Sequence, residues 1–339
     1  MTSDPQVCVI IAAFNAERTI ARAVRSALAQ KFVTEVIVCD DASRDASVAV
    51  ARDCDDDTGR LSVITSPRNV GPAAARNIAL ASSRAPLVCL LDSDDYMLPG
   101  RISRLIASGG EGWDFLADDI VIVPEALDSE LIALPPQHTG MTVHVAEFVR
   151  SNISRPGKPR AELGFMKPIM RREFLERNRL RYDETLRLGE DYALYVQALI
   201  AGAVFKVVSA CGYVAVERST SISSRHSAAD LKRIVDFDAA CLASPAALSE
   251  QERAALEAHQ RATLDKYRYR VVLDTKSTEG LLAALRVLAA MPGAWLYIAA
   301  ETLRAKLHAY APRLSRGRGQ DTEGKVRYLI GFPLSEGRR

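Results

Sequence analysis

Four short runs of apolar residues alternate with helix-type segments along the first hundred residues of the chain. The runs lie at residues 7–11, 36–39, 61–64 and 87–91. They are mostly continuous rather than alternating, a pattern typical of strands that are covered on both faces of a parallel sheet. Between the first two runs, Ile20, Val24, Ala27 and Leu28 recur at helical spacing. This alternation predicts an open, doubly wound, Rossmann-like α/β sheet.

Polar residues follow three of the four runs. They are Asn15 after the first, Asp40 and Asp41 after the second, and Asp92, Asp94 and Asp95 after the fourth. In a doubly wound sheet the ligand binds at the carboxyl ends of the strands. We therefore expect these side chains to share one edge of the sheet. Asn15 is also predicted to be the N-cap of the first helix, with Glu17 in its first turn, where a negative charge suits the helix dipole.

The carboxylates of Asp92, Asp94 and Asp95 fall within four positions. Crowded carboxylates repel one another and resist desolvation, so such a site usually holds a hard cation, and oxygen ligands suit Mg²⁺ or Mn²⁺. Side chains two positions apart on a strand point the same way, so we expect Asp92 and Asp94 to converge on one cation. The alternative is a solvated turn. The acidic run at residues 53–57 is interpreted as such a turn, with a metal role as its alternative.

The pattern is less regular after residue 100. We predict a strand at residues 115–123, a helix at 144–152, a strand and helix within 165–180, a helix from Glu190, and strands at 205–208 and 213–216. Loop signals occupy residues 127–136, and basic loops are predicted at residues 155–159 and 218–225.

From about residue 226 the pattern is helical, which predicts an extension over residues 226–339. Residues 281–307 are rich in Ala and Leu, but Arg286 and the Pro292-Gly293 break leave no stretch of about 20 apolar residues that could span a bilayer. Two interpretations stay open. The segment is either an interfacial helix pair, helped by a tail in which residues 313–339 carry seven Lys/Arg against three Asp/Glu, or a packing surface for the preceding domain.

Composition sets the broad class. Of 339 residues, 48% are hydrophobic and 25% charged, which are ordinary values for a globular protein, and the net charge of +2 favours no nucleic-acid partner. The six cysteines show no C-x-x-C spacing, so we expect reduced core thiols, with a buried disulfide as the alternative. Residues 1–6 are polar and acidic, unlike a secretory signal. We expect a cytoplasmic protein, with peripheral contact at the inner face of the cell membrane if the helix pair is interfacial.

Five short motifs occur in the order typical of one enzyme family. They are Ala12-Ala13-Phe14-Asn15, Val38-Cys39-Asp40-Asp41-Ala42-Ser43, Asn69-x-Gly71-x4-Arg76-Asn77, Leu91-Asp92-Ser93-Asp94-Asp95 and Gly189-Glu190-Asp191. Over residues 5–225 the chain resembles the inverting family 2 glycosyltransferases, which have the GT-A fold. Within that family it is most similar to the glucosyltransferases of succinoglycan-type exopolysaccharide assembly. The resemblance implies a GT-A catalytic domain at residues 1–225.

The resemblance also implies how a nucleotide-sugar donor is held. Ala12, Phe14 and Asp41 would contact the uridine, and a carboxylate that accepts from the uracil N–H separates uracil from cytosine. For Asp41 an N-cap before Ser43 is the alternative. The remaining donor-binding candidates are Asn15, Arg76, Ser93, Asp95 and Arg218. Arg76 either faces the nucleotide or forms a structural ion pair, and Asp95 is expected at the sugar hydroxyls.

Two further pairs of acidic residues match the family's chemistry. Asp92 and Asp94 match its D-x-D motif and would hold Mg²⁺ or Mn²⁺ on the donor diphosphate. Asp191 matches its general base, which removes the acceptor hydroxyl proton, and the charge of Glu190 beside it would raise the proton affinity of the pair. The alternative for Asp191 is a carboxylate that stabilises a helix start.

One position departs from the family pattern. Arg218 stands where many relatives have a His near the metal or diphosphate, and an Arg binds phosphate but does not ligate a metal. The Q-x-x-R-W signature of processive synthases is absent, which favours addition of one sugar per encounter.

The expected function is transfer of a hexose, glucose from a UDP-sugar, to a glycan or lipid-linked oligosaccharide acceptor in bacterial exopolysaccharide synthesis. A sugar-1-phosphate nucleotidyltransferase is one alternative, although it would need a Gly-rich, basic phosphate loop after the first strand. A non-catalytic scaffold subunit that binds sugar nucleotide is the other.

Overall fold

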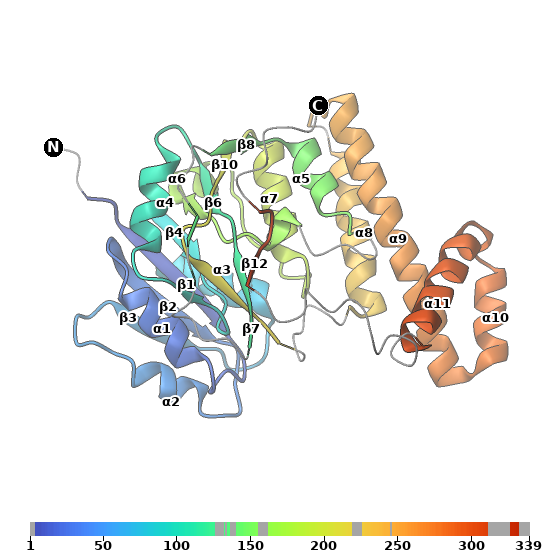
Figure 1. Ribbon diagram of the computed structural model, residues 1–339, viewed down its shortest axis with the longest axis horizontal. Helices are drawn as coiled ribbons and strands as arrows, with labels where there is room; N and C mark the ends of the chain where they lie inside the picture. Colours follow the sequence, from blue (N-terminus) through green and yellow to red (C-terminus); the bar gives the residue numbers. More distant parts are fainter. Residues whose placement is uncertain are drawn as a thin grey trace. The chain divides into compact units, whose positions relative to one another are not determined.

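The computed structural model describes residues 4–125, 132, 134–135, 140–154, 162–218, 226–244, 246–310 and 326–331. The chain divides into two compact units (Figure 1). We call them the sheet unit, Met1–Ser219 with Val326–Arg339, and the helical unit, Thr220–Lys325.

The first half of the sheet unit has the predicted strand-helix alternation. Its elements are β1 (Val7–Ala13), α1 (Ile20–Leu28), β2 (Val33–Asp40), α2 (Ser47–Arg52), β3 (Leu61–Thr65), α3 (Pro72–Ser82) and β4 (Leu87–Leu90). The strands pair in parallel, with Ile10 beside both Ile37 and Leu90. Because nearly all residues of β1, β2 and β4 are buried, continuous apolar sequence is what these positions require.

The order of the strands fixes where a ligand can bind. The main sheet runs β3-β2-β1-β4-β9-β6-β10-β8. The chain moves outward from β1 to β3 and then returns to β4, so right-handed connections place α1 and α2 on one face of the sheet and α3 on the other. The crevice where the direction reverses lies between the carboxyl ends of β1 and β4.

The second half of the main sheet is mixed. Its elements are α4 (Arg101–Gly109), β6 (Phe115–Asp118), β8 (Met141–Val143), α5 (Val145–Ser151), the short 3₁₀ helix η2 (Leu163–Phe165), β9 (Ile169–Arg171), α6 (Arg172–Arg177), α7 (Glu190–Ile200) and β10 (Phe205–Val208). Strand β9 lies antiparallel between β4 and β6. The core here is aromatic: Phe115, Phe148, Tyr195 and Phe205 pack with ring centroids 5.6–6.1 Å apart.

A second sheet completes this unit. It contains β5 (Tyr96–Met97), β7 (Val121–Pro124), β11 (Tyr213–Glu217) and β12 (Arg327–Tyr328), in the order β12-β7-β11-β5. Strand β12 pairs with β7, and both carboxylate oxygens of Asp119 accept backbone N–H groups, from Ile330 and Gly331. The extension predicted for residues 226–339 is therefore corrected, because residues 326–331 return to the sheet unit.

The helical unit has four helices and one 3₁₀ turn among its described residues. They are α8 (Ala228–Ala243), α9 (Glu250–Glu279), α10 (Leu281–Ala289), η4 (Pro292–Ala294) and α11 (Trp295–Tyr310). Ser227 and Ser249 cap α8 and α9, each accepting a hydrogen bond from a backbone N–H three positions on. Of the helices described, none is by itself long and apolar enough to cross a bilayer; α10 combined with residues 292–304 passes that test, with a bend of 101°.

Three local predictions differ from the structure. Asn15 is not an N-cap, because α1 begins five residues later, at Ile20. Asp41 is not an N-cap before Ser43, because α2 begins at Ser47. The single strand predicted at residues 115–123 is two strands, β6 and β7, which belong to different sheets. The basic loop predicted at residues 155–159 lies outside the described residues, as does the one predicted at residues 218–225 except for Arg218.

Candidate active site

The end of β1 contributes an exposed aromatic ring and a tightly held loop. Phe14 is 44% exposed and Ala12 half-buried. Asn15 has a left-handed backbone, with φ of 50°, which Asn tolerates better than most residues. Its N–H donates to Ser43 Oγ at 2.8 Å, and its Oδ1 accepts from the Arg44 N–H at 2.9 Å. Asn15 therefore connects the loops that follow β1 and β2.

The paired aspartates after β2 differ in what they bind. The two oxygens of Asp41 accept the backbone N–H groups of Val70 at 2.6 Å and Gly71 at 2.8 Å, at the entrance to α3. Asp40 is 1% exposed; its Oδ2 accepts from Ser43, while its Oδ1 has no hydrogen-bond partner among the described protein groups. The oxygen of this pair that lacks a partner therefore belongs to Asp40, which the sequence placed at the ligand edge without a role of its own.

The four residues Asp92, Ser93, Asp94 and Asp95 form a turn rather than a continuation of the strand. Strand β4 ends at Leu90, and the Asp95 N–H donates to the Asp92 carbonyl at 3.1 Å. The expectation that Asp92 and Asp94 share a direction because they lie on a strand was wrong. Ser93 lies partly exposed at the tip of this turn.

Asp95 is a support for this turn and not a surface residue. Its side chain is 7% exposed, and its oxygens accept from the Tyr213 hydroxyl at 2.8 Å and the Val216 N–H at 3.0 Å. Burial, together with the charges of Asp92 and Asp94, raises the pKa of Asp95 well above its usual value. The predicted contact of Asp95 with sugar hydroxyls is corrected, because both oxygens are held inside the protein.

A cluster of three carboxylates and two cations lies beside the turn. Arg76, on α3, places Nη1 at 2.5 Å from Glu190 Oε1 and 3.2 Å from Asp191 Oδ1, and Nη2 at 2.9 Å from Asp92 Oδ1. Lys167 places Nζ at 2.6 Å from Asp191 Oδ2 and 3.0 Å from Asp92 Oδ2. The two halves of the predicted site are therefore one cluster, and Arg76 is an ion-pair partner.

The start of α7 presents Glu190 and Asp191 to that cluster. The residue before them, Gly189, has φ of 78°, a left-handed conformation in which glycine carries no Cβ strain. Burial raises the pKa of Glu190, the charge of Asp191 adds to the shift, and Arg76 opposes it. The predicted repulsion between the two carboxylates therefore contributes to the raised pKa of Glu190, but burial is the larger cause.

The cations alter the metal-binding half as well. Burial acts to raise the pKa of Asp92, but Lys167 and Arg76 outweigh it and hold that pKa below its usual value. Asp94 differs, because burial and the charge of Asp92 raise its pKa. The guanidinium of Arg218 lies 3.0 Å from Asp94 Oδ2 and 3.3 Å from Glu125 Oε1. Arg218 therefore reaches the predicted position, beside the carboxylate turn.

The turn fits a divalent cation in its donor chemistry. Asp92 and Asp94 offer carboxylate oxygens, and Mg²⁺ is commonly bound by one or two carboxylates together with substrate phosphates and waters. The side chain of Asp94 is 45% exposed, and its raised pKa means that an added positive charge would stabilise its ionised form. In the described ranges, no group of three or more His, Cys, Asp or Glu side chains is arranged to hold a metal ion.

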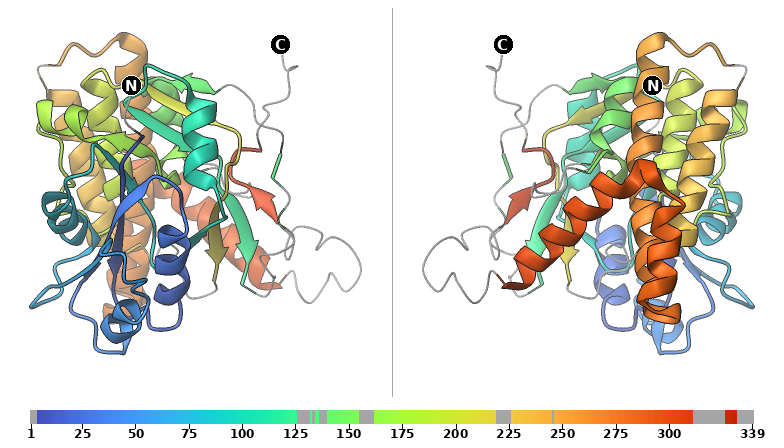
Figure 2. Two further views of the ribbon diagram at one scale, coloured as in Figure 1. Left: turned by 90° about the vertical axis from the view of Figure 1, so that its left-hand side faces the viewer. Right: turned by 90° about the vertical axis from the view of Figure 1, so that its right-hand side faces the viewer.

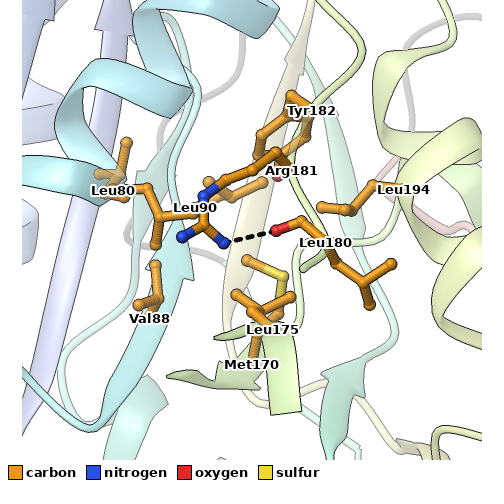
Figure 3. Close-up of a pocket in the computed structure, with 10 residues that line it drawn as sticks. Leu80, Val88, Leu90, Met170, Leu175, Leu180, Arg181, Tyr182 and Leu194 are labelled. Carbon is orange, nitrogen blue, oxygen red and sulfur yellow. Dashed lines mark hydrogen bonds between the residues drawn. The ribbon is translucent and has the colours of Figure 1, made fainter. Parts of the chain in front are cut away.

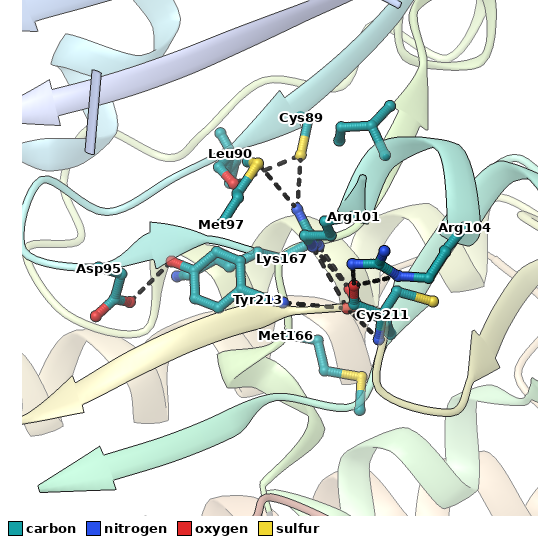
Figure 4. Close-up of polar contacts among 12 residues, drawn as sticks. Cys89, Leu90, Asp95, Met97, Arg101, Arg104, Met166, Lys167, Cys211 and Tyr213 are labelled. Carbon is teal, nitrogen blue, oxygen red and sulfur yellow. Dashed lines mark hydrogen bonds and ion pairs between the residues drawn. The ribbon is translucent and has the colours of Figure 1, made fainter. Parts of the chain in front are cut away.

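A buried layer beneath the turn positions these groups (Figure 4). Arg101 is fully buried; its guanidinium donates to Asp118 Oδ1 at 2.6 Å and to the Lys167 carbonyl at 2.9 Å. The same guanidinium lies 5.0 Å from the centre of the Tyr213 ring. The Tyr213 hydroxyl accepts from the Asp92 N–H at 3.2 Å and donates to Asp95. One buried arginine thus supports both Lys167 and the turn.

An apolar crevice lies on the other side of the cluster (Figure 3). Tyr182 lines it, and the Arg76 guanidinium lies 5.5 Å from the centre of the Tyr182 ring. The other lining residues are mainly aliphatic, including Leu80, Val88, Leu90, Met170 and Leu194. These side chains belong to the core between α3, β4 and α7, and Tyr182 connects this apolar packing with Arg76.

Sequence reasoning missed four residues of this arrangement, namely Arg101, Asp118, Lys167 and Tyr213. Lys167 precedes β9, whose Ile169 pairs with Cys89 of β4. Because β9 runs antiparallel, its amino end meets the carboxyl end of β4, which places Lys167 beside Asp92. The only available signal was Asp118, a carboxylate at the end of an apolar run.

Comparison with known proteins supplies the family. The protein-family model described as Glycosyl transferase family 2 matches residues 8–125 of the chain. The chain is 44% identical over 329 residues to the succinoglycan biosynthesis protein ExoU of Rhizobium meliloti (strain 1021), which covers 96% of this chain and 95% of that protein. It is 39% identical over 101 residues to UDP-Glc:alpha-D-GlcNAc-diphosphoundecaprenol beta-1,3-glucosyltransferase WfaP of Escherichia coli, over 30% of this chain and 39% of that protein.

A solved structure agrees on the fold. The crystal structure of S. aureus TarS 1-349 in complex with UDP-GlcNAc matches 80% of this chain and 74% of that chain, with a TM-score of 0.52 at 20% identity. This likeness shows the GT-A fold. Since the relative at 44% identity extends over nearly all of both chains, the chain belongs to glycosyltransferase family 2.

Proposed function

We propose that this protein is an inverting hexosyltransferase that moves glucose from UDP-glucose to a lipid-linked oligosaccharide in bacterial exopolysaccharide synthesis. The observation that supports it most is the cluster in which Lys167 and Arg76 connect Asp92 with Asp191. It brings the residue expected at the leaving group and the residue expected at the nucleophile into one site.

The names of the two relatives support the finer parts of the proposal. The extended relative is a succinoglycan biosynthesis protein, which favours exopolysaccharide synthesis. The partial relative is a UDP-Glc-dependent enzyme whose acceptor is a diphosphoundecaprenol, which favours a UDP-glucose donor and a lipid-linked acceptor. The chain spans about two fifths of that second protein, so its donor and acceptor are taken here as a proposal.

The donor would enter at the carboxyl ends of β1, β2 and β4. The exposed ring of Phe14 offers a stacking surface for the uracil, with Ala12 beside it on β1. A carboxylate oxygen that accepts from the uracil N–H would complete this contact. Asp41 keeps that proposed role, although its oxygens already accept two backbone N–H groups.

Asp92 and Asp94 would hold the divalent cation, and Arg218 would face the diphosphate next to it. Bound Mg²⁺ or Mn²⁺ supplies Lewis-acid stabilisation of the negative charge on the departing nucleoside diphosphate. Ser93, partly exposed at the tip of the same turn, is placed to contact the donor. Asp95 keeps the turn in shape through Tyr213 and Val216.

Asp191 would remove the proton from the acceptor hydroxyl as the hydroxyl oxygen attacks the anomeric carbon opposite the leaving group. The bond from that carbon to the diphosphate breaks, and the anomeric configuration inverts. The oxygens of Asp191 are directed by Lys167 and Arg76, which hold the carboxylate in one orientation. Glu190 lies one position earlier on α7, and its ion pair with Arg76 keeps that guanidinium in place.

The experiment that tests this function is a transfer assay with the full chain, a membrane extract or a purified polyprenyl-diphosphate oligosaccharide as acceptor, and UDP-, GDP- and dTDP-sugars as donors. Each donor is tested with and without Mg²⁺ or Mn²⁺. The proposal predicts metal-dependent transfer from UDP-glucose and a product whose anomeric configuration is opposite to that of the donor. Retention of configuration, or donor binding with no transfer to any acceptor, would overturn it.

A further inference from the structure

Among the described residues, the large apolar side chains with the highest exposed fractions lie on two helices, α10 and α11. Within the described ranges, every large hydrophobic side chain that is at least 50% exposed lies on α10 or α11. We call this set the apolar face: Leu281, Leu282, Leu285, Trp295, Leu296, Leu303 and Leu307. Leu282 is 75% exposed and Leu296 is 89% exposed, whereas exposed hydrophobics elsewhere reach at most 44%. A concentration of this kind marks an interaction surface.

The opposite sides of the same helices are already packed. Ala284 of α10, Ala294 of η4 and Ile298 of α11 form a buried cluster with Val272 of α9. The two helices are therefore apolar on both their inner and their outer sides.

The charges around the apolar face have one dominant sign. Between residues 281 and 307 the chain has three basic residues, Arg286, Arg304 and Lys306, and one acidic residue, Glu301. Glu301 pairs with Arg304, so the exposed charges of this segment are the cations Arg286 and Lys306. Exposed leucines flanked by cations complement an anionic lipid surface, which offers phosphates above an apolar layer.

The geometry favours lying on a bilayer over crossing it. Helix α10 has 9 residues and α11 has 16. At a rise of about 1.5 Å per residue, each helix is shorter than a hydrocarbon core of about 30 Å. The two helices are bent by 101° (Figure 2). Trp295, half-exposed, stands at this bend with its ring N–H donating to the Leu288 carbonyl. Tryptophan is the residue most typical of the membrane interface.

An open groove between the helices adds a place for an acyl chain. Its volume is about 330 Å³, and its lining includes Leu288, Trp295, Ile298 and Leu303 together with one cation, Lys306. An apolar groove with a cation beside it matches the two parts of a phospholipid, the acyl chain and the phosphate.

We propose that the apolar face of α10 and α11 docks on an anionic phospholipid bilayer, with its leucines and Trp295 in the layer between headgroups and acyl chains and with Arg286 and Lys306 at lipid phosphates. The inference goes beyond the proposed function, because it rests on the helical unit alone. A lipid-linked acceptor gives the docking a purpose, since both would then meet at one membrane surface.

The test is co-sedimentation of the full chain with sucrose-loaded vesicles. Vesicles of phosphatidylcholine with phosphatidylglycerol are compared with vesicles of phosphatidylcholine alone. The proposal predicts stronger binding to the anionic vesicles and a loss of at least about tenfold in the Leu282→Glu/Leu296→Glu double variant. Neutralising Arg286 and Lys306 to Gln should weaken binding to anionic vesicles by about fivefold per residue. The matched control is Ile78→Glu, an exposed hydrophobic on α3, which should bind as the wild type does.

Trp295 provides a second readout that avoids a drastic change to the surface. The only other tryptophan, Trp113, is buried, so a blue shift of the fluorescence on adding vesicles should come from Trp295 and vanish in Trp295→Phe. An unshifted wild-type spectrum together with unchanged sedimentation of the double variant would overturn the proposal.

The competing occupants of the surface give different results. If a second copy of the chain covers it, the wild type is a dimer in analytical ultracentrifugation, the double variant is a monomer, and neither binds vesicles. If another part of the same chain covers it, the double variant lowers the unfolding temperature and the wild type does not bind vesicles. Both results overturn the proposal. If the wild type fails to transfer glucose to a short-chain, water-soluble acceptor, that result would instead count against the proposed function, because the reaction needs no vesicle.

Discussion

Lys167 joins the two halves of the site, because its Nζ lies 2.6 Å from Asp191 Oδ2 and 3.0 Å from Asp92 Oδ2. Lys167 is 6% exposed, so this ammonium group is held in the protein interior by the carboxylates it pairs with. Their charges outweigh the effect of burial and raise the pKa of Lys167 above its usual value. The amine therefore stays positively charged and can act only as a donor to both carboxylates.

Replacing Lys167 tests whether this contact positions the base. Lys167→Met should lower kcat for sugar transfer by about 10²-fold, because a shift of about 1 Å in the position of a general base is enough to cause a loss of that size. The KM for the donor should change far less, and Lys167→Arg should recover part of kcat. The matched control is Lys206→Met, since Lys206 donates to the Gly109 and Glu111 carbonyls, away from the cluster. A proportional fall of kcat in both variants would indicate a general loss of structure.

The carboxylate turn is tested by metal removal and by Asp94. Chelation with EDTA should abolish transfer, and added Mg²⁺ or Mn²⁺ should restore it. Asp94→Asn should raise the metal concentration needed for half-maximal activity by at least about tenfold, since one charged oxygen ligand is lost. Asp55→Asn in the exposed acidic run near α2 is the control and should leave the metal dependence unchanged. If full activity persists in EDTA, Asp92 and Asp94 are not metal ligands.

The buried thiols predict a specific loss of stability at high pH. All six cysteines are free and buried, which confirms the expected core thiols. Burial raises the pKa of Cys8 from 9.0 to about 12, and the charge of Glu35 adds to the shift. A thiol whose folded pKa is raised contributes its full share to stability below the unfolded value of 9.0, and that share is lost as the pH rises towards 12.

Urea unfolding of the wild type and of Cys8→Ala measures this contribution. At pH 7 the wild type should be the more stable of the two. By pH 10 its advantage should shrink by on the order of 1 kcal/mol, because only the wild type has this thiol to ionise in the unfolded state. An advantage that is constant from pH 7 to pH 10 would show that the Cys8 thiol ionises as easily in the folded protein as in the unfolded one.

The first half of the sheet unit was predictable because its information is local. Strands β1, β2 and β4 are runs of apolar residues that need burial on both faces, and each must be followed by a helix to return to the same edge. The family motifs singled out Asp92, Glu190, Asp191 and Arg76, and the structure brings these four residues together. What the motifs did not contain is the partner of each charge, because ion pairs are set by tertiary structure.

The missed residues depend on contacts between distant parts of the chain. Lys167 reaches Asp92 only because β9 inserts antiparallel between β4 and β6, and no local pattern distinguishes an antiparallel insertion from a parallel strand. Strand β12 is two residues long, and Asp119 accepts its hydrogen bonds from a segment more than 200 positions away. Residues 115–123 were predicted as one strand, although Asp118 and Asp119 interrupt the apolar run. In the fold both aspartates are buried and hydrogen-bonded, and they stand between β6 and β7.

The proposed mechanism depends most on Asp191 as the group that removes the acceptor proton. The direct measurement is kcat for sugar transfer by Asp191→Asn, together with the affinity for the sugar nucleotide and the unfolding temperature of the same variant. Asn keeps the shape of the side chain but cannot accept the proton. Glu190→Gln, the same change one position earlier on α7, serves as the matched comparison. If Asp191 is the base, kcat should fall by at least about 10²-fold in Asp191→Asn and by less in Glu190→Gln, while donor affinity is retained. A kcat for Asp191→Asn close to that of the wild type would contradict it.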